Sequence, residues 1–446
     1  MDISKSDIKK VYFKYLATAF GSTLISTIYS FVDMAMVGRY YGPDGTAALA
    51  VISPIWNVIF SLGLLTGIGG SVLFSIKRSG NPKNSESENE YFTAALIFSI
   101  VLAAATTAFL WLYEKEIFAF CGADETILPI ALLYMKPIKF VFPIFLLSQL
   151  ISAFLRNDND PTLATIAVIS GGVFNIFGDY FCVFVLDLGA FGAGLATAIG
   201  AVISFMVLIT HFFKKTNTLK LVKPKKFFNK IKSITVTGFS SFFIDVAMGI
   251  LAVLFNRQIM KYLGTTALAV YGTIINISTF VQCCAYSVGQ ASQPIFSANY
   301  GAGHIDRIKK TLKLAIITSF VFGAIWTTLS LVYPEIYVKI FMEPTPEIYE
   351  IAPAIIRTYA ISFILLPFNI FSTYYFQSIL QPKKSFVVSV MRGLVISSAL
   401  ILLLPLIAPK NSIWLTMPIT EAIVTVYVVI SVISCTRSLE NKIAKN

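Results

Sequence analysis

Long apolar segments recur along the whole chain, and most of them exceed the roughly 20 residues that a helix needs to cross a bilayer. Backbone amides and carbonyls in lipid must find partners within their own segment, so each segment is expected to be helical. Only 13% of the 446 residues are charged, about half the fraction found in typical soluble domains. The chain is therefore predicted to be an all-α integral membrane protein.

Helix-breaking residues between the apolar segments divide the chain into twelve expected transmembrane helices. The first follows a basic N-terminal stretch, and its apolar part is too long for the core of a signal peptide, so we interpret it as a spanning helix. The expected spans cover residues 14–38, 47–76, 91–113, 126–152, 162–186, 191–213, 233–262, 266–298, 311–333, 347–378, 385–407 and 412–436.

Basic residues gather in every second connection between these spans. The longest basic connection is KKTNTLKLVKPKKFFNKIK at 214–232, and the intervening connections are short or acidic, such as YYGPDG and DLGAFG. By the positive-inside rule, both termini are expected in the cytoplasm. The protein is expected to be a multi-pass protein of the cell membrane. The same rule accounts for the net charge of +12, and no nucleic-acid partner is expected.

The two halves of the chain resemble each other. GTAALAV at 45–51 returns in the second half as GTTALAV at 264–270, and Pro161 is echoed at nearly the same offset by Pro382. We therefore predict a six-helix lobe at 1–213, a basic cytoplasmic linker at 214–232 and a second six-helix lobe at 233–446. Six helices per lobe make the repeats parallel, related by a pseudo-twofold axis along the membrane normal.

A carboxylate lies deep inside the apolar stretch NIFGDYFCVFVLDLGAFGAGLATA, at Asp179. A charged side chain near the bilayer centre costs about 2.5–3.5 kcal/mol on insertion scales, so Asp179 should have a task or a partner. Asn175 lies four residues earlier on the same helix face. Thr197, beyond the DLGAFG turn, and Asp33 in the first span are expected at a similar depth.

These four residues form a candidate cation-coupling site. Their oxygens are hard ligands suited to Na⁺, and two neighbouring carboxylates titrate as a coupled pair, so either Na⁺ or H⁺ could use them. The positions of the second half that correspond to Asp33 and Asp179 through the repeat hold Phe255 and Leu400. The repeated fold therefore does not require the carboxylates, which favours a functional role for them.

Other polar residues within the expected spans are candidates for lining a substrate cavity. They are Asn57, Gln149, Asp245, Asn276 and Glu421. Asp245 and Glu421 have a second interpretation, which is pairing with a base such as Arg392 or Arg257. The five cysteines show no metal-ligand spacing, and His211 and His304, at expected helix ends, are interpreted as solvated. No cofactor is expected beyond the coupling ion.

Three segments resemble multidrug and toxic compound extrusion (MATE) transporters. They are FVDMAMVGRYYGPDGTAALAV at 31–51, FLRNDNDPTLATIAVISGGVFNIFGDYFCVF at 154–184 and GAFGAGLATAIG at 189–200. The resemblance covers essentially the whole chain and implies a cation-coupled exporter with twelve helices in two lobes. YYFQSILQPKKSFVVSVMRG at 374–393 is similar to the bacterial branch whose coupling carboxylates lie in the N-terminal lobe. Asp33, Asn175, Asp179 and Thr197 match the positions that coordinate Na⁺ or take a proton in that branch.

The sequence departs from the MATE pattern at two places. The first span usually carries a proline well before its aspartate, where Thr18 stands here, and GFS at 238–240 replaces a Gly-x-Pro. A mechanism that bends the first helix at a proline therefore does not transfer directly, although Gly21 could provide a softer hinge.

The predicted function is antiport of H⁺ or Na⁺ against amphipathic, often cationic, drugs by alternating access, carried out by a monomer in membrane lipid. The alternative is a flippase for lipid-linked oligosaccharides or other lipids from the same wider superfamily. A membrane enzyme is disfavoured because the sequence shows no catalytic cluster at a membrane face. A scaffold is disfavoured because it would not need buried carboxylates, and a channel is disfavoured because it would need a pore-lining motif.

Overall fold

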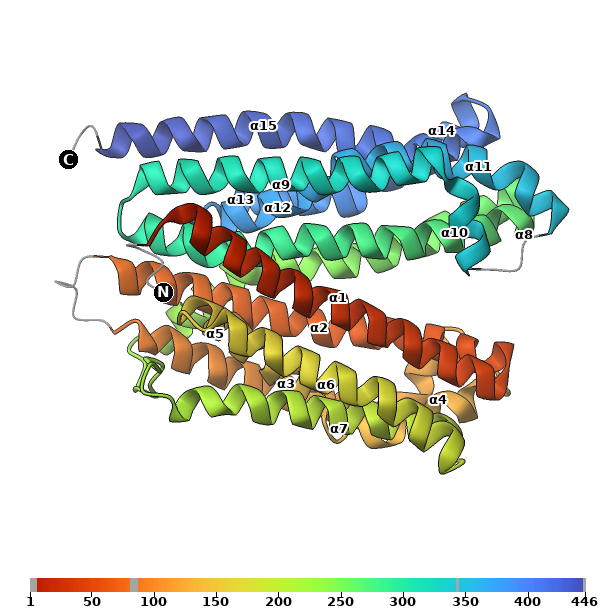
Figure 1. Cartoon of the computed structure of the whole chain (residues 1–446), viewed down its shortest axis with the longest axis horizontal. Coiled ribbons are helices and arrows are strands. Elements are labelled where there is room, and N and C mark those ends of the chain that lie inside the picture. The colour runs from red at the N-terminus through yellow and green to blue at the C-terminus, as the bar shows by residue number, and fades with distance from the viewer. Residues whose placement is uncertain (1–5, 81–86, 342–344, 444–446) are drawn as a thin grey trace. The chain divides into compact units, whose positions relative to one another are not determined.

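The computed structural model describes residues 6–80, 87–341 and 345–443. Every regular element within these residues is helical (Figure 1). The first half holds α1 (Ile8–Tyr41), α2 (Pro43–Ser79), α3 (Asn89–Phe120), α4 (Ile127–Ile138), α5 (Phe142–Asn157), α6 (Pro161–Tyr180), the π-helical turn η1 (Phe181–Val185), α7 (Gly189–Ile209) and the 3₁₀ turn η2 (Thr210–Phe213).

The long helix α8 (Phe227–Gly301) follows, and the remaining elements complete the second half. These are α9 (Ile305–Val332), α10 (Pro334–Phe341), α11 (Pro346–Ala360), η3 (Ile361–Ile364), α12 (Leu366–Ser378), α13 (Pro382–Val390), η4 (Met391–Val395), α14 (Ile396–Ile407), η5 (Lys410–Leu415) and α15 (Thr416–Ile443).

Ten helical segments of the described chain are long and apolar enough to cross a membrane, and the bent pair α4–α5 makes an eleventh. The 75 residues of α8 count once in that number, yet a bilayer needs only roughly 20. α8 is interrupted at Gly264, whose φ of 81° is a conformation that glycine adopts far more readily than other residues. Counting α8 as two spans gives the twelve that the sequence predicts.

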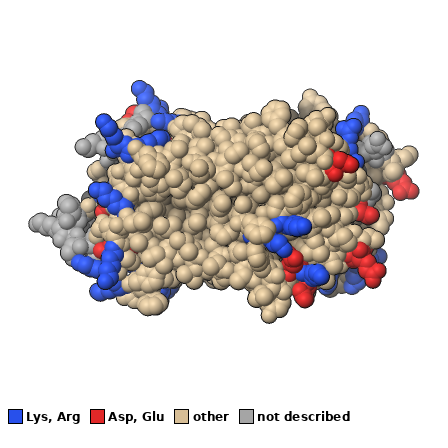
Figure 2. All heavy atoms as spheres, turned by 90° about the horizontal axis from the view of Figure 1, so that it is seen from below, with Lys and Arg blue, Asp and Glu red and all other residues tan. Residues whose placement is uncertain are grey.

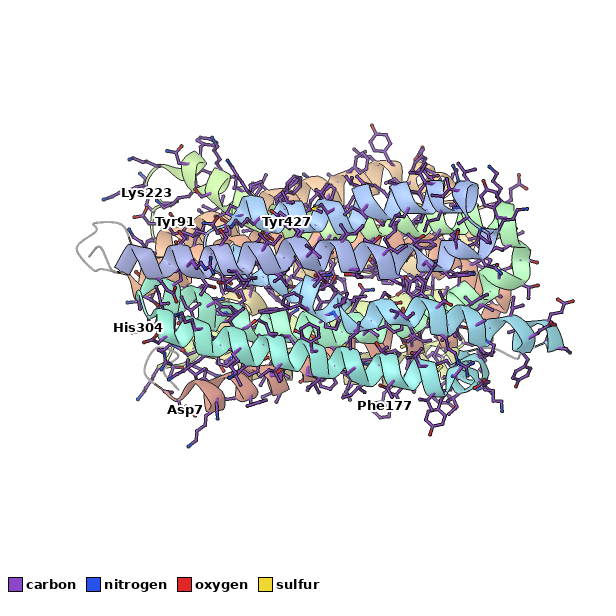
Figure 3. The ribbon with its side chains drawn as sticks, turned by 90° about the horizontal axis from the view of Figure 1, so that it is seen from above. Asp7, Tyr91, Phe177, Lys223, His304 and Tyr427 are labelled. Carbon is purple, nitrogen blue, oxygen red and sulfur yellow. The ribbon has the colours of Figure 1, made fainter. Side chains whose placement is uncertain are left out.

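The surface between the helix ends is apolar. On the face drawn in Figure 2, most Lys, Arg, Asp and Glu side chains gather toward two ends, and uncharged residues form nearly all of the surface between them. Large apolar side chains are exposed there, including Leu112 and Phe177, each 72% exposed. Figure 3 shows Phe177 pointing away from the ribbon. Such a surface suits contact with lipid tails.

The chain divides into two compact units. The first unit comprises residues 17–242, and the second comprises residues 243–443 together with the described start of α1. The basic segment 214–232, expected as a linker between the lobes, is therefore grouped with the first unit.

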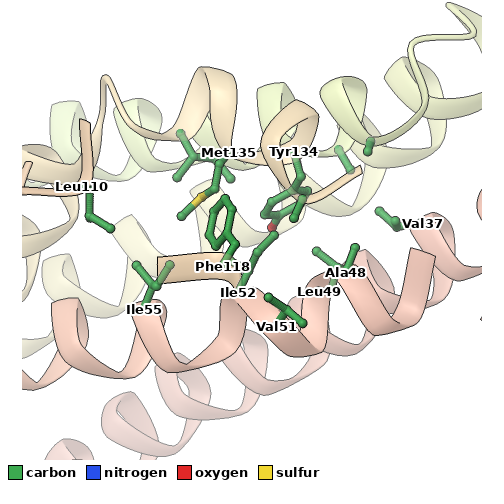
Figure 4. Packing of buried hydrophobic residues seen from close by; sticks show 14 of the residues in the cluster. Val37, Ala48, Leu49, Val51, Ile52, Ile55, Leu110, Phe118, Tyr134 and Met135 are labelled. Carbon is green, nitrogen blue, oxygen red and sulfur yellow. The ribbon is translucent and has the colours of Figure 1, made fainter. Parts of the chain in front are cut away.

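The core of the first unit includes two apolar clusters of described residues. One gathers side chains of α1, α2, α3, α4 and α7, among them Val37, Ile52, Phe118 and Tyr134 (Figure 4). The other joins α2, α3, α5, α6 and α7 around Phe74, Phe92 and Phe154.

Helices α6 and α7 approach each other closely because glycines face the contact. A Cβ atom added at Gly171 would lie 2.4 Å from the backbone oxygen of Gly200, which is too close for any side chain. The same close approach brings Asn175 on α6 beside Thr197 on α7. Small residues at this crossing therefore determine how closely Asn175 and Thr197 approach each other.

Candidate functional site

The polar residues predicted on α6 and α7 form one hydrogen-bonded group inside the first unit. The Asn175 amide Nδ2 donates to Thr197 Oγ1 at 3.0 Å and to Asp179 Oδ1 at 3.3 Å. All three side chains are buried, and Asp179 is completely inaccessible. The structure thus places three of the four predicted residues in direct contact.

The fourth residue, Asp33 on α1, is joined to this group through Tyr134 on α4. The Tyr134 hydroxyl donates a hydrogen bond to Asp33 Oδ2, and Tyr134 also interacts with Thr197 and with the charge of Asp179. Sequence reasoning missed Tyr134, because a tyrosine in an apolar span carries no pattern that distinguishes it from the other aromatic residues. Its position inside the apolar cluster of Figure 4 holds the hydroxyl in place.

Three oxygens of this group are buried without a hydrogen-bond partner: Asp33 Oδ1, Asn175 Oδ1 and Asp179 Oδ2. Buried polar atoms are nearly always satisfied in folded proteins, so each unsatisfied one needs an explanation. Carboxylate and amide oxygens are ligands for hard cations, and a carboxylate can also take a proton. No group of three or more His, Cys, Asp or Glu side chains suited to a metal ion occurs among the described residues.

Three of the substrate-cavity candidates, Asn57, Gln149 and Asn276, do not join this group. Asn57 on α2 is exposed, Gln149 on α5 packs beside Gly63, and Asn276 on α8 is half-buried. Among the described residues, no hydrogen bond links these three to the carboxylates. The side chain of Asp245 lies outside the described side chains.

Glu421 is paired with Arg392, which agrees with the second interpretation of this residue, pairing with a base. Glu421 is completely buried in the second unit, and its Oε1 accepts from Arg392 Nε at 2.7 Å. Its Oε2 accepts from Asn369 Nδ2 at 2.7 Å, and Thr425 donates to Asn369 Oδ1 at 3.1 Å. Both carboxylate oxygens are engaged, so binding a cationic substrate there would require breaking an ion pair.

His211 is not solvated, contrary to the prediction. It is fully buried in η2, directly after α7, with Nε2 at 2.8 Å from Asp158 Oδ2 and Nδ1 at 3.0 Å from Asp160 Oδ2. Ionised carboxylates only accept hydrogen bonds, so both ring nitrogens donate and the imidazole carries a positive charge. The two aspartates lie far from His211 in the sequence, before α6 rather than after α7, which is why the sequence pattern did not reveal the contact.

Taken together, these features define a multi-pass helical membrane protein with a buried, partly unsatisfied polar group inside one of its two units. A family model described as MatE matches residues 19–181 and matches again over residues 239–402. The chain belongs to the MatE family of membrane transporters. One match falls in each half of the chain, in agreement with the repeat that the sequence predicts.

Two relatives are similar to this chain over most of their length. Multidrug export protein MepA of Staphylococcus haemolyticus is 25% identical over 416 residues, covering 92% of this chain and 90% of the relative. Probable multidrug resistance protein YoeA of Bacillus subtilis is 22% identical over 360 residues, covering 78% of this chain and 76% of the relative.

Solved structures share the fold. An outward-facing multidrug resistance MATE family transporter of the MOP superfamily superimposes with a TM-score of 0.91 at 19% identity over 98% of both chains. A MOP superfamily transporter from Pyrococcus furiosus, whose structure is described as having a binding pocket of reverse polarity, gives a TM-score of 0.90 at 19% identity, also over 98% of both chains.

Proposed function

We propose that this protein exports amphipathic, often cationic, compounds in exchange for H⁺ or Na⁺ by alternating access. The observation that carries the proposal is the group of Asp33, Asn175, Asp179 and Thr197, in which three buried oxygens lack partners. The positions that correspond to Asp33 and Asp179 in the second half are the apolar Phe255 and Leu400. At these two positions only the first half carries carboxylates, so the repeated fold does not need them.

In the proposed orientation, the protein lies in the cell membrane with both termini in the cytoplasm. A single chain is the transport unit. An ion entering from outside neutralises Asp33 and Asp179, and the membrane potential favours its inward passage by about 2.3 kcal/mol per charge per 100 mV. The ion drives export only if it binds the outward-facing and inward-facing states with different affinity. Loading favours release of the exported compound, and unloading inside restores affinity for it.

Related proteins support an exporter of small organic compounds. Two relatives carry the names multidrug export protein and probable multidrug resistance protein, and each aligns over three quarters or more of its length. Transfer of that activity to this chain is part of the proposal.

The test is efflux of a fluorescent cation from cells or inverted vesicles under separately imposed Na⁺ and pH gradients. We expect efflux from the wild type with one of the gradients, and loss of it in Asp179→Asn. Asp187→Asn is the matched control, because Asp187 is an exposed carboxylate in the turn after the same helix. Unchanged efflux in well-folded Asp179→Asn contradicts the role of Asp179.

A lipid flippase is the second candidate function. A buried arginine suits a negatively charged head group, and Arg392 Nη2 is buried without a partner. Glu421 already pairs with this arginine, which favours the exporter. Failure of the wild type to move any cation, combined with movement of a labelled anionic lipid, would reverse that preference.

A further inference from the structure

The segment from Phe213 to Lys232 combines strong positive charge with exposed apolar side chains. It contains no acidic residue, and seven of its lysines are exposed: Lys214, Lys215, Lys220, Lys223, Lys225, Lys226 and Lys232. Lys214 pairs with Asp160 at 2.7 Å. Figure 3 shows Lys223 pointing away from the ribbon.

This basic segment is fixed along its length to the first unit. The backbone N–H of Lys220 donates to Asn89 Oδ1 at 2.8 Å, and that of Val222 donates to Thr93 Oγ1 at 3.0 Å. The backbone N–H of Lys225 donates to Glu90 Oε2 at 2.7 Å. All three acceptors belong to the first turns of α3. The backbone therefore faces the protein. Lys230 is buried and pairs with Glu90 at 3.0 Å, whereas the seven exposed lysines have side chains on the surface.

The start of the basic segment is anchored by the buried carboxylate of Asp158. Asp158 accepts from the backbone N–H of Thr218 at 3.0 Å and also from the Thr218 hydroxyl. The same carboxylate pairs with Arg78 at 2.6 Å and with His211 at 2.8 Å. Because two cations hold Asp158 in place, Thr218 has a rigid acceptor rather than a mobile surface group.

Large apolar side chains are exposed among the lysines. Phe213 is 85% exposed, Leu221 is 71% exposed and Phe228 is 81% exposed. Phe213 ends the span that contains α7, and Phe228 lies in the first turn of α8, so both stand where spanning helices leave the hydrocarbon layer. Apolar side chains flanked by lysines are typical of segments that bind at the level of lipid head groups.

We propose that residues 213–232 form a binding surface for anionic phospholipid head groups in the adjacent leaflet. The exposed lysines contact the phosphate groups, while Phe213, Leu221 and Phe228 enter the boundary between head groups and acyl chains. A basic connection that served only to orient the protein would need lysines but no ordered backbone. Here three hydrogen bonds and a buried anchor hold the lysines in a defined arrangement.

Binding can be measured on the purified full-length protein by native mass spectrometry. The protein is titrated with phosphatidylglycerol and, separately, with phosphatidylcholine of the same acyl chains. We expect the wild type to bind phosphatidylglycerol preferentially. Changing Lys215, Lys220, Lys223 and Lys225 together to Gln should weaken phosphatidylglycerol binding by about tenfold or more, because each lysine near an anionic surface contributes attraction. Added salt should weaken binding in the wild type as well.

The matched control changes four other exposed lysines, Lys9, Lys10, Lys310 and Lys313, to Gln. It removes the same charge from the ends of other helices and should leave the preference for phosphatidylglycerol near the wild-type value. Equal loss in both variants would show a general charge effect and overturn the proposal. A wild type that binds the two lipids equally would overturn it too.

A separate variant tests the fixed arrangement. Thr218→Val keeps every lysine but removes one hydrogen bond to Asp158, so it should lower the lipid preference while net charge stays constant. Wild-type preference in this variant would contradict the claim that Thr218 helps to hold the lysines in place. These measurements require no transport, so their failure is distinct from failure of the proposed exporter function.

Discussion

Tyr134 donates a hydrogen bond to the carboxylate of Asp33, although the two residues lie 101 positions apart in the chain. The contact joins α1 to α4 and links Asp33 with the polar group formed by Asn175, Asp179 and Thr197. In the second unit, Phe255 stands at the position that corresponds to Asp33 through the repeat. Tyr359 corresponds to Tyr134 at nearly the same offset along the chain. The rings of Phe255 and Tyr359 lie 6.3 Å apart in an edge-to-face contact. The second unit therefore has an apolar aromatic contact where the first has a carboxylate and its hydrogen-bond donor.

Replacing Tyr134 with Phe should impair ion coupling while leaving the fold intact. The ring still fills the apolar cluster, but Asp33 loses its hydroxyl donor, and hydrogen bonds to charged groups contribute about 1.5–3 kcal/mol. We expect the concentration of the driving ion that gives half-maximal efflux to change by about tenfold or more. Tyr180→Phe, at an exposed tyrosine of α6, is the control and should behave as wild type. Identical ion dependence in the two variants would remove Tyr134 from the proposed site.

The crossing of α6 and α7 should not tolerate a side chain at Gly171. A Cβ there would lie 2.4 Å from the Gly200 oxygen, so Gly171→Ala forces the helices apart and separates Asn175 from Thr197. Overpacking of this kind typically costs about 1–3 kcal/mol. We expect a lower temperature of unfolding in detergent and reduced coupled efflux.

Gly249→Ala is the control for that substitution. Gly249 also lies within a helix, but a Cβ there would meet nothing within 4 Å. Its thermal stability should be unchanged or slightly higher, because alanine favours helix more than glycine does. Equal destabilisation of the two variants would show that helix propensity and close packing cannot be separated at these sites.

The buried pair of Arg392 and Glu421 should be far more sensitive to loss of one partner than to loss of both. Arg392→Met or Glu421→Met alone leaves an uncompensated buried charge, which typically destabilises by about 3–5 kcal/mol. The double variant removes both charges and should recover most of that loss. A double-mutant cycle on the unfolding temperature measures the coupling, and simple addition of the two losses would argue against a stabilising ion pair.

Asp160 should stabilise the first unit in a pH-dependent way. Burial alone would raise the pKa of its carboxyl, but hydrogen bonds from His211 and Lys214 lower the pKa to about 2, from an ordinary value of 3.8. A lowered pKa in the folded state gives stability that is fully present above about pH 4 and is lost as the pH falls toward 2.

The measurement compares thermal unfolding of the wild type and Asp160→Asn between pH 7 and pH 2. The difference in unfolding temperature should be constant above about pH 4 and should shrink below it. Lys214→Met removes one of the two donors that lower the pKa of Asp160. In that background, the difference in unfolding temperature should shrink over a narrower pH range. A difference that does not vary with pH would show that Asp160 contributes through its helix-capping contact with Leu163 alone.

The sequence by itself determined the membrane class, the twelve spans and the repeat. Apolar runs longer than a bilayer's thickness have few alternatives to spanning helices, because lipid offers no partners for backbone groups. The internal repeat then located the carboxylates at Asp33 and Asp179 as features that the fold does not require. Their helical spacing also predicted that Asn175 and Asp179 share a face, and the structure has them hydrogen-bonded.

Only the tertiary structure decided which distant residues complete each polar group. Tyr134 and His211 were not distinguishable in the sequence from ordinary aromatic and solvated residues, and Arg392 and Arg257 were both candidate partners of Glu421. The structure decided these roles because they depend on contacts between helices far apart in sequence. Helical periodicity specifies the direction of a side chain relative to its own helix but not the neighbour it meets. That neighbour is set by how closely the helices pack, as the glycines at 171 and 200 show for α6 and α7.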